Sequence, residues 1–300
     1  MPAMVFPRVP FEPISVPLLT ASSISAILGA ARRGAPSARV SLDLHLSYEE
    51  VPIRGGEAHI RGVAVRLGDL EEALARASSQ DVVAAWPDGS LGKVQFFSSG
   101  SFYKLRNVEG SAPTLEINGI HMHRISGSTP WDDALAKVRA ARVGPGSVVL
   151  DTATGLGYTA VHSLGAGASR VLTVEVDPNV LRMASLNPWS RGLASGRVEV
   201  VPGDAVEVVG SLPGGTFTHV LHDPPRFALS PRMYSGELYS QILRVLRPGG
   251  VLLHYTGEPG RARGRNLPGS TASRLRSAGF EVLGYDPRVM AVIARRPRRS

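Results

Sequence analysis

One stretch of the sequence predicts the fold: Val148-Val149-Leu150-Asp151-Thr152-Ala153-Thr154-Gly155-Leu156-Gly157-Tyr158. Its first part is apolar, as in a buried strand, and its second part carries glycines where a turn leads into a helix. Only a residue with little or no side chain lets the backbone approach a ligand closely. The stretch therefore predicts a strand, a ligand-binding turn and a helix.

Two later strands also end in acidic residues. The run from Arg170 is apolar until Glu175, which lies 24 residues after Asp151. A carboxylate there can accept hydrogen bonds from both hydroxyls of a ribose. A helix cap or a solvated strand end would also explain Glu175, but Gly203-Asp204-Ala205 follows the next strand in the same way. Three strand ends in order therefore predict a nucleotide site.

Apolar strands alternate with helix-length segments over the second half of the chain. A helix from Thr129 to about Arg142 precedes them, because Thr129-Pro130 is a typical helix start. We expect the strands at 147–150, 170–175, 197–201, 216–222 and 250–255. The alternation predicts a doubly wound, mostly parallel α/β sheet. Two final strands, at 281–284 and 289–295, are joined too closely for a crossover and should pair antiparallel.

The first part of the chain follows a different pattern. Alternating strands at 39–46 and 59–67 are separated by Gly55-Gly56, a short helix follows Asp69, and Asn118-Gly119 marks a hairpin. We therefore divide the chain into a small, mainly β N-terminal domain at 1–125 and an α/β domain at 126–300.

Composition excludes several classes of protein. Hydrophobic residues make up 43% and charged residues 19%, which is typical of a globular chain. Cysteine is absent, which excludes disulfides, thiolate metal sites and a cysteine nucleophile. The apolar stretch at 16–31 is interrupted by Pro17 and follows no basic run, so we expect no signal peptide, no membrane partner and a cytoplasmic location.

Positive charge is concentrated at the end of the chain. Residues 226–300 hold 14 basic and 4 acidic side chains, whereas residues 1–125 hold 12 of each. A basic surface confined to one region is typical of proteins that bind a phosphate backbone, although it would also improve solubility. We predict that RNA binds this basic C-terminal quarter, including Arg261, Arg263, Arg265 and the cluster from Arg295 to Arg299.

The fourth strand of the expected sheet ends in Asp223-Pro224-Pro225-Arg226-Phe227. A carboxylate and a proline carbonyl can both accept hydrogen bonds from an amino group and so direct its nitrogen. The prolines fix a rigid turn, and the aromatic residue after them can stack on a base. A Pro-Pro turn that ends an ordinary strand is the alternative.

Histidines are weaker candidates for a site. His121 and His123 share one strand face without a third ligand nearby, so we expect no metal site. His222 and His254 each end a strand at the expected active-site edge, and we expect them to line the pocket without catalysing the reaction.

Residues 130–296 resemble class I S-adenosylmethionine-dependent methyltransferases. The turn after Asp151 is similar to their motif D/E-x-G-x-G-x-G, with Ala153 at the place of the first glycine. The run from Asp223 resembles the D/N-P-P-Y/F motif of enzymes that methylate exocyclic amino groups of nucleobases, with Arg226 at the aromatic place and Phe227 one step later. Together with 150–160 and Asn187-Pro188-Trp189-Ser190, this run looks like an archaeal group of predicted RNA methyltransferases.

The resemblance implies a seven-stranded methyltransferase sheet and S-adenosylmethionine as the cofactor. It assigns cofactor binding to Asp151, Ala153, Gly155, Gly157, Tyr158, Glu175, Asp204 and Ala205. It assigns the catalytic role to Asp223, Pro224, Pro225, Arg226 and Phe227, with no metal.

Three functions fit these features. The leading hypothesis is methylation of an exocyclic amino group of a base in ribosomal or transfer RNA, such as cytidine N4. A D-P-P-R string also occurs in enzymes that methylate carbon 5 of uridine, but that chemistry needs a cysteine. An aminopropyltransferase of polyamine synthesis shares the sheet, yet its cationic acceptor needs an acidic pocket. The third hypothesis is a noncatalytic RNA-binding protein. The sequence does not predict the oligomeric state.

Overall fold

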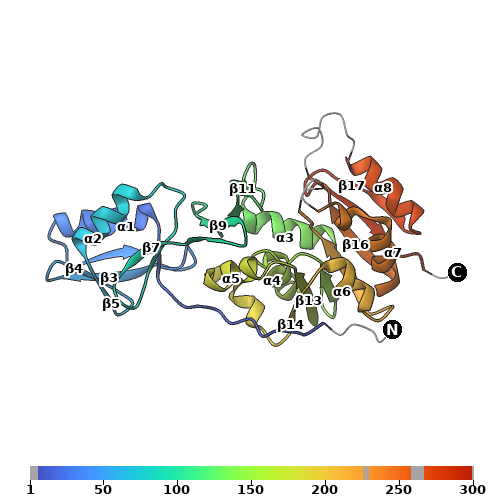
Figure 1. The fold of residues 1–300 in the computed structure, drawn as a ribbon, viewed down its shortest axis with the longest axis horizontal. Coiled ribbons are helices and arrows are strands. Elements are labelled where there is room, and N and C mark those ends of the chain that lie inside the picture. Colours follow the sequence, from blue (N-terminus) through green and yellow to red (C-terminus); the bar gives the residue numbers. More distant parts are fainter. Residues whose placement is uncertain (1–5, 226, 228–229, 258–266, 299–300) are drawn as a thin grey trace. The chain divides into compact units, whose positions relative to one another are not determined.

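The structure, a computed structural model, describes residues 6–225, 227, 230–257 and 267–298 (Figure 1). It divides into two compact units. The sheet unit comprises Met1–Glu12, Asp132–Leu181 and Gly192–Ser300, and the N-terminal unit comprises Pro13–Trp131 and Arg182–Arg191. This division differs from the expected boundary at residue 125, because residues 6–12 pack with the sheet unit and Arg182–Arg191 packs with the N-terminal unit.

The sheet unit contains a seven-stranded sheet in the order β14-β13-β12-β15-β16-β18-β17. Its strands are β12 (Val148–Asp151), β13 (Arg170–Glu175), β14 (Val198–Pro202), β15 (Phe217–His222), β16 (Leu246–Tyr255), β17 (Glu281–Asp286) and β18 (Ala291–Arg295). The first five are parallel to one another, and β18 pairs antiparallel with both β16 and β17. The prediction of a mixed α/β fold with a mostly parallel sheet is confirmed.

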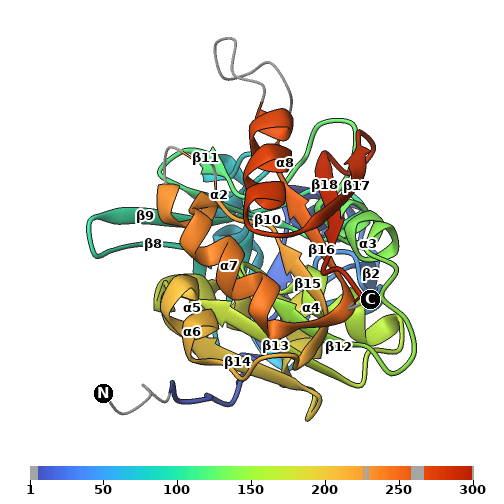
Figure 2. The same cartoon turned by 90° about the vertical axis from the view of Figure 1, so that its right-hand side faces the viewer.

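Helices pack on both faces of this sheet. In the sheet unit these are α3 (Pro130–Ala140), α4 (Tyr158–Gly165), α6 (Ala205–Ser211), α7 (Gly236–Val245) and α8 (Leu267–Ser277), with the short helix η2 (Pro231–Tyr234) before α7. Two further helices, α5 (Pro178–Leu186) and η1 (Pro188–Ala194), contain most of the segment Arg182–Arg191, which belongs to the N-terminal unit. Figure 2 shows α6 and α7 on one side of the strands and α3 and α4 on the other. The expected helix at 129–142 corresponds to α3.

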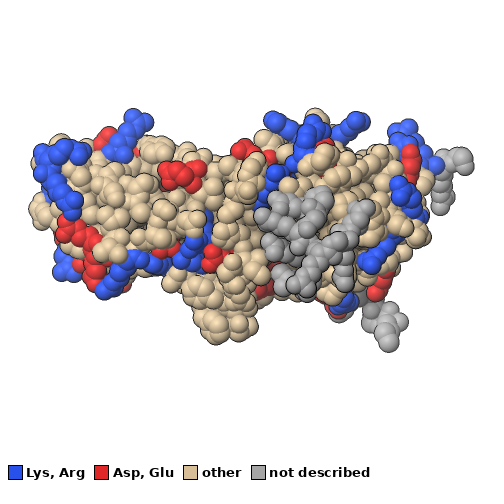
Figure 3. All heavy atoms as spheres, turned by 90° about the horizontal axis from the view of Figure 1, so that it is seen from above, with Lys and Arg blue, Asp and Glu red and all other residues tan. Residues whose placement is uncertain are grey.

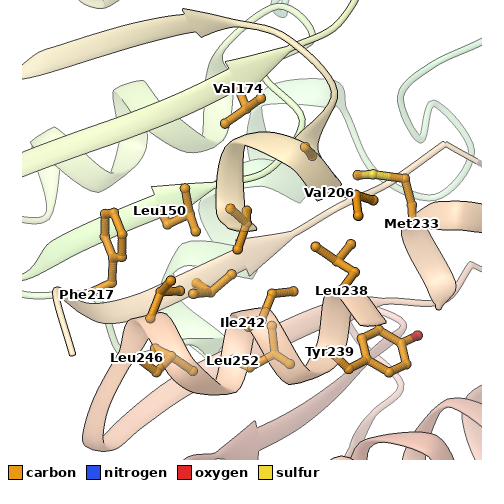
Figure 4. Packing of buried hydrophobic residues seen from close by; sticks show 14 of the residues in the cluster. Leu150, Val174, Val206, Phe217, Met233, Leu238, Tyr239, Ile242, Leu246 and Leu252 are labelled. Atoms are coloured by element: carbon orange, nitrogen blue, oxygen red, sulfur yellow. The ribbon is translucent and has the colours of Figure 1, made fainter. Parts of the chain in front are cut away.

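Alternation along the strands explains this layering. Leu150 of β12 and Leu252 of β16 point into the cluster under α6, α7 and α8, whereas Val149 and Leu253, one residue away, belong to the cluster under α3 and α4. Successive side chains of a strand face opposite sides, so a strand buried on both faces is apolar throughout. Figure 4 shows the first cluster, in which Phe217, Ile242 and Leu246 also lie.

The N-terminal unit contains small antiparallel sheets and two helices, α1 (Ala21–Arg32) and α2 (Leu67–Arg76). Its sheets have the orders β1-β6-β7, β2-β3-β4-β5 and β11-β10-β9-β8. The strands are β1 (Leu18–Leu19), β2 (Ser37–Val40), β3 (Glu49–Arg54), β4 (Glu57–Ile60), β5 (Val63–Arg66), β6 (Val83–Ala85), β7 (Leu91–Lys93), β8 (Gln95–Ser98), β9 (Ser101–Arg106), β10 (Thr114–Ile117) and β11 (Ile120–His121).

Turns in this unit agree with the sequence in one place and differ in another. The hairpin at Asn118-Gly119 is confirmed, with φ of 50° and 79° at these residues. The strand expected at 39–46 ends at Val40, because the His45 N–H donates to the Ser41 hydroxyl at 2.8 Å and the backbone turns there. The Gly55-Gly56 turn therefore joins β3 to β4 instead.

The described helices include none that is long and apolar enough to cross a bilayer.

Candidate functional site

A glycine turn connects β12 to α4 at the carboxyl edge of the sheet. Gly155 and Gly157 have φ of 53° and 79°, a region that other residues rarely adopt. A Cβ at Gly157 would also lie 2.5 Å from Leu193 Cδ1. Ala153 is half-buried in this turn, and Tyr158 is buried in the first turn of α4 with 2% of its surface exposed. The turn is therefore fixed by backbone geometry and close packing.

Asp151 ends β12 as a fully buried carboxyl group. Its Oδ2 accepts hydrogen bonds from the hydroxyls of Thr159 at 2.9 Å and Thr173 at 3.0 Å. Its Oδ1 has no hydrogen-bond partner within the described part of the chain. Burial raises the pKa of Asp151 to about 7. A buried carboxyl group with a raised pKa is typical of functional sites. A buried acceptor without a partner also destabilises the fold, so Asp151 Oδ1 indicates a place for a ligand.

Glu175 ends β13 beside the glycine turn. Its Oε2 accepts from the Gly155 N–H and its Oε1 from the Asp177 N–H, both at 3.0 Å. No cation of the described residues pairs with it, and burial raises its pKa to about 7. The Gly203 N–H donates to the Glu175 carbonyl at 2.9 Å, so the ends of β12, β13 and β14 meet at one edge.

Asp204 has a structural role at the same edge. It is the N-cap of α6, where its Oδ1 accepts from the Val206 N–H at 2.8 Å. Its Oδ2 accepts from Arg232 Nη1 at 3.0 Å, and Ala205 is buried in the first turn of the helix. Asp204 can bind adenine only if it gives up or shares the Arg232 contact.

Asp223 follows β15, the strand next to β12. Its Oδ2 accepts from Lys137 Nζ of α3 at 2.6 Å, and Lys137 also contacts Asp133 Oδ2 at 2.7 Å. The same ammonium lies 4.0 Å from the centre of the Tyr255 ring. Asp223 Oδ1 makes no hydrogen bond to any described residue.

Sequence analysis missed Lys137. The position of Lys137 in the sequence could have indicated its role, because Lys137 shares the buried face of α3 with Ala134 and Val138. A lysine on the apolar side of an amphipathic helix needs a buried anion, since an unpaired buried charge is costly.

The residues that follow Asp223 in the Asp223–Phe227 run differ in their exposure. Pro224 is buried and Pro225 is exposed, and the Pro225 carbonyl accepts from the Tyr234 hydroxyl at 3.0 Å. Phe227 packs edge-to-face on Tyr234, with the ring centres 5.3 Å apart. A base that stacks on Phe227 would therefore have to use a part of the ring that Tyr234 does not contact. Arg226 lies outside the described residues.

His222 and His254 do not line a pocket, because both are fully buried. His222 Nε2–H donates to the Met233 carbonyl at 2.8 Å, so its Nδ1 accepts from the Thr152 hydroxyl at 2.7 Å. His254 Nδ1–H donates to the Tyr255 carbonyl and its Nε2 accepts from Tyr239, both at 2.8 Å. Burial lowers the pKa of His222 to about 4 and that of His254 well below its usual value. These neutral rings connect the ends of β12, β15 and β16.

The remaining predictions concern His121, His123 and the basic C-terminal quarter. His121 contacts Glu116 and His123 contacts Thr114, and no cluster in the described ranges has the ligands for a metal ion. Several arginines of the basic C-terminal quarter bind the chain itself: Arg244 and Arg296 donate to backbone carbonyls and Arg295 pairs with Glu281. On the face drawn in Figure 3, cationic side chains form separate groups interspersed with acidic ones.

Comparison with known proteins identifies the family. No protein-family model matches the chain. The uncharacterized protein MJ1233 of Methanocaldococcus jannaschii is 43% identical over 212 residues, which cover 70% of this chain and 72% of that protein. The chain belongs to the MJ1233 family.

More distant relatives of this MJ1233-family chain fall in two groups. Polyamine aminopropyltransferase 2 of Streptomyces coelicolor is 33% identical over 170 residues, 54% of this chain and 30% of that protein. Ribosomal RNA large subunit methyltransferase I of Photobacterium profundum is 31% identical over 156 residues, 48% of this chain and 39% of that protein. The matched segments therefore span less than half of either relative.

Among solved structures, a spermidine synthase in complex with the transition state analogue AdoDATO matches with a TM-score of 0.55 and 20% identity. The match covers 68% of this chain and 73% of that one. With the sequence relatives, it places the MJ1233-family chain in the class I S-adenosylmethionine-dependent methyltransferase fold, of the spermidine-synthase-like kind.

Proposed function

We propose that the chain is an S-adenosylmethionine-dependent methyltransferase that acts on an exocyclic amino group of an RNA base, such as cytidine N4 of ribosomal RNA. The observation that carries this proposal is Asp223, which follows β15 with one carboxylate oxygen held by Lys137 and the other without a partner among the described residues. Asp223 lies beside β12, whose turn forms the candidate cofactor site.

The cofactor site fits an adenosyl compound by the chemistry of its groups. Among the described residues no cation pairs with the Glu175 carboxylate and no donor reaches the buried Asp151 Oδ1, and Gly155 and Gly157 permit close approach of the backbone. We assign cofactor binding to the predicted set: Asp151, Ala153, Gly155, Gly157, Tyr158, Glu175, Asp204 and Ala205. S-adenosylmethionine, when bound, supplies a methyl group on a positively charged sulfur.

Asp223 and Pro224 orient the acceptor in this proposal. The amino group donates one N–H to Asp223 Oδ1 and the other to the Pro224 carbonyl. The lone pair of a base amino group is delocalised into the ring, and these hydrogen bonds favour the pyramidal nitrogen that attacks. They therefore strengthen toward the transition state, which raises kcat.

Glu175 makes cofactor binding sensitive to pH. Ribose hydroxyls donate to the ionised carboxylate, and the pKa of Glu175 is raised to about 7, so below this pH the group must lose a proton before binding. We expect the affinity for S-adenosylmethionine to fall by up to about tenfold per pH unit below pH 7 and to level off above it. Calorimetry from pH 5.5 to 8.5 measures this.

The matched control is Glu175→Gln, which should bind about 1 to 3 kcal/mol more weakly at pH 8 and show a flatter pH profile. Asp151, whose pKa is also about 7, remains in this variant, so the difference between the two profiles reports Glu175. Equal affinity and equal profiles would contradict the assignment.

Aminopropyl transfer is the second candidate, favoured by the likeness to the polyamine aminopropyltransferase and to the spermidine synthase. A direct test incubates the protein with RNA and methyl-labelled S-adenosylmethionine, and in parallel with a diamine and decarboxylated S-adenosylmethionine. Mass spectrometry of nucleosides should locate the label on an exocyclic nitrogen. Label on a ring carbon or a ribose oxygen, or product in the diamine reaction alone, would show that the proposal is wrong.

A further inference from the structure

A buried cation site lies at the acceptor end of the sheet unit. Asp133 of α3 and Asp223 after β15 approach one point from two elements, and the ring of Tyr255 at the end of β16 covers it. Two carboxylates and an aromatic face are the groups that recognise an alkylammonium ion. The ammonium at this point belongs to the chain itself, to Lys137.

The contacts of Lys137 are those of a bound ligand. Its Nζ lies 2.7 Å from Asp133 Oδ2, 2.6 Å from Asp223 Oδ2 and 4.0 Å from the centre of the Tyr255 ring. The exposed fraction of the side chain is 6% for Lys137 and Asp133 and 26% for Asp223. Burial alone would lower the pKa of Lys137, but the two carboxylates raise it above its usual value, so the cation persists.

We propose that Asp133, Asp223 and Tyr255 form an alkylammonium site that Lys137 fills, and that this intramolecular plug restricts Asp223 to neutral amino acceptors. With Lys137 in place, the cluster has a net charge of −1, and Asp223 Oδ1 remains for an acceptor. Without it, two adjacent carboxylates would bind a substrate amine. The second half of the proposal rests on the proposed function, and the first does not.

This plug also explains how the fold of a spermidine synthase can serve a different acceptor. An amine cation that enters the acceptor site meets the Lys137 ammonium at the position it would need, and like charges in a partly desolvated site repel strongly. A base amino group carries no charge and needs only an acceptor oxygen. Lys137 is therefore a specificity residue that acts through Asp223.

Chemical rescue tests the plug directly. Lys137→Ala removes three methylenes and the ammonium, which with one added hydrogen make the n-propylammonium ion. We expect n-propylammonium to raise the Tm of Lys137→Ala with a saturable dose response, by about 3 °C at roughly ten times its Kd. The wild type and Lys137→Met, in which a side chain of similar length fills the space, should not respond. Neutral 1-propanol should not replace the ion.

A second variant covers the case in which Lys137→Ala fails to fold because two buried carboxylates repel each other. Lys137→Ala with Asp133→Asn retains the net charge of −1 and should still bind n-propylammonium, more weakly. A Tm of both variants that is independent of n-propylammonium, or a shift that 1-propanol reproduces, would overturn the proposal.

The same variants separate the plug from the proposed function. If wild-type protein methylates RNA, Lys137→Ala should lose at least about tenfold in kcat and recover part of it with n-propylammonium, while Lys137→Met should lose activity without recovery. If wild-type protein methylates no RNA, the proposed function fails, and the Tm responses still decide the plug.

Discussion

Asp223→Ala is expected to lower kcat for methyl transfer by about 100- to 1,000-fold, the loss typical of removing one oriented group that stabilises a transition state. Cofactor affinity should change little, because Glu175 and the glycine turn lie on other strand ends. The fold should persist, since Lys137 retains Asp133 as a partner at 2.7 Å. Single-turnover assays with labelled cofactor, together with calorimetry, measure both quantities.

A conservative variant and a control variant accompany this experiment. Asp223→Asn retains an acceptor oxygen and should keep part of the activity. Glu281→Gln removes a carboxylate from a surface ion pair with Arg295 in the same unit and should leave kcat unchanged. A kcat for Asp223→Ala close to that of the wild type, or a parallel loss of cofactor binding, would show that Asp223 does not orient the acceptor.

The sheet was predictable because local pattern and tertiary structure agree there. Strands buried on both faces are apolar throughout, so β13 has the predicted bounds of 170–175 and β15 begins one residue after the predicted start. The glycine turn was also recognisable, since Gly155 and Gly157 both have a positive φ that other residues rarely adopt. The apolar strands and the turn conformation are set within one segment and therefore appear in the sequence.

Features that depend on distant partners were not predictable. The ion pair between Lys137 and Asp223 joins residues 86 positions apart, and the sequence around Asp223 does not indicate it. His222 and His254 were expected to line a pocket, but hydrogen bonds to Thr152 and Tyr239 let the fold bury them. Satisfied polar groups can be fully buried, so polarity alone did not predict exposure.

Charge was the least informative signal. The 14 basic residues of 226–300 predict a cationic surface, yet Arg244 donates to three carbonyls between 209 and 212, and Arg288 pairs with Asp286. The side chains of these arginines already have partners within the chain. Arg247, Arg276 and Arg298 are exposed, and their side chains make no hydrogen bond or ion pair with other described residues, so they remain candidates for phosphate contacts.

We expect RNA affinity to fall steeply with salt, by about 1,000-fold or more between 50 and 200 mM if six or more phosphates are contacted. Each phosphate contact releases counterions and contributes about −0.9 to the slope of log K against log salt, somewhat less for single strands. Replacing Arg247, Arg276 and Arg298 with glutamine should therefore reduce the slope by up to about 3. Replacing Arg261, Arg263 and Arg265 should reduce it by a similar amount.

Arg288→Gln serves as the control, because it removes one positive charge from an arginine already paired with Asp286 at 2.7 Å and should leave the slope unchanged. Fluorescence anisotropy with one RNA at several salt concentrations gives all slopes. Both triple variants are expected to weaken binding almost equally for different RNA sequences, since phosphate contacts carry no sequence information. If neither slope nor affinity changed in either triple variant, the basic C-terminal quarter would serve solubility, and RNA would have to bind elsewhere on the chain.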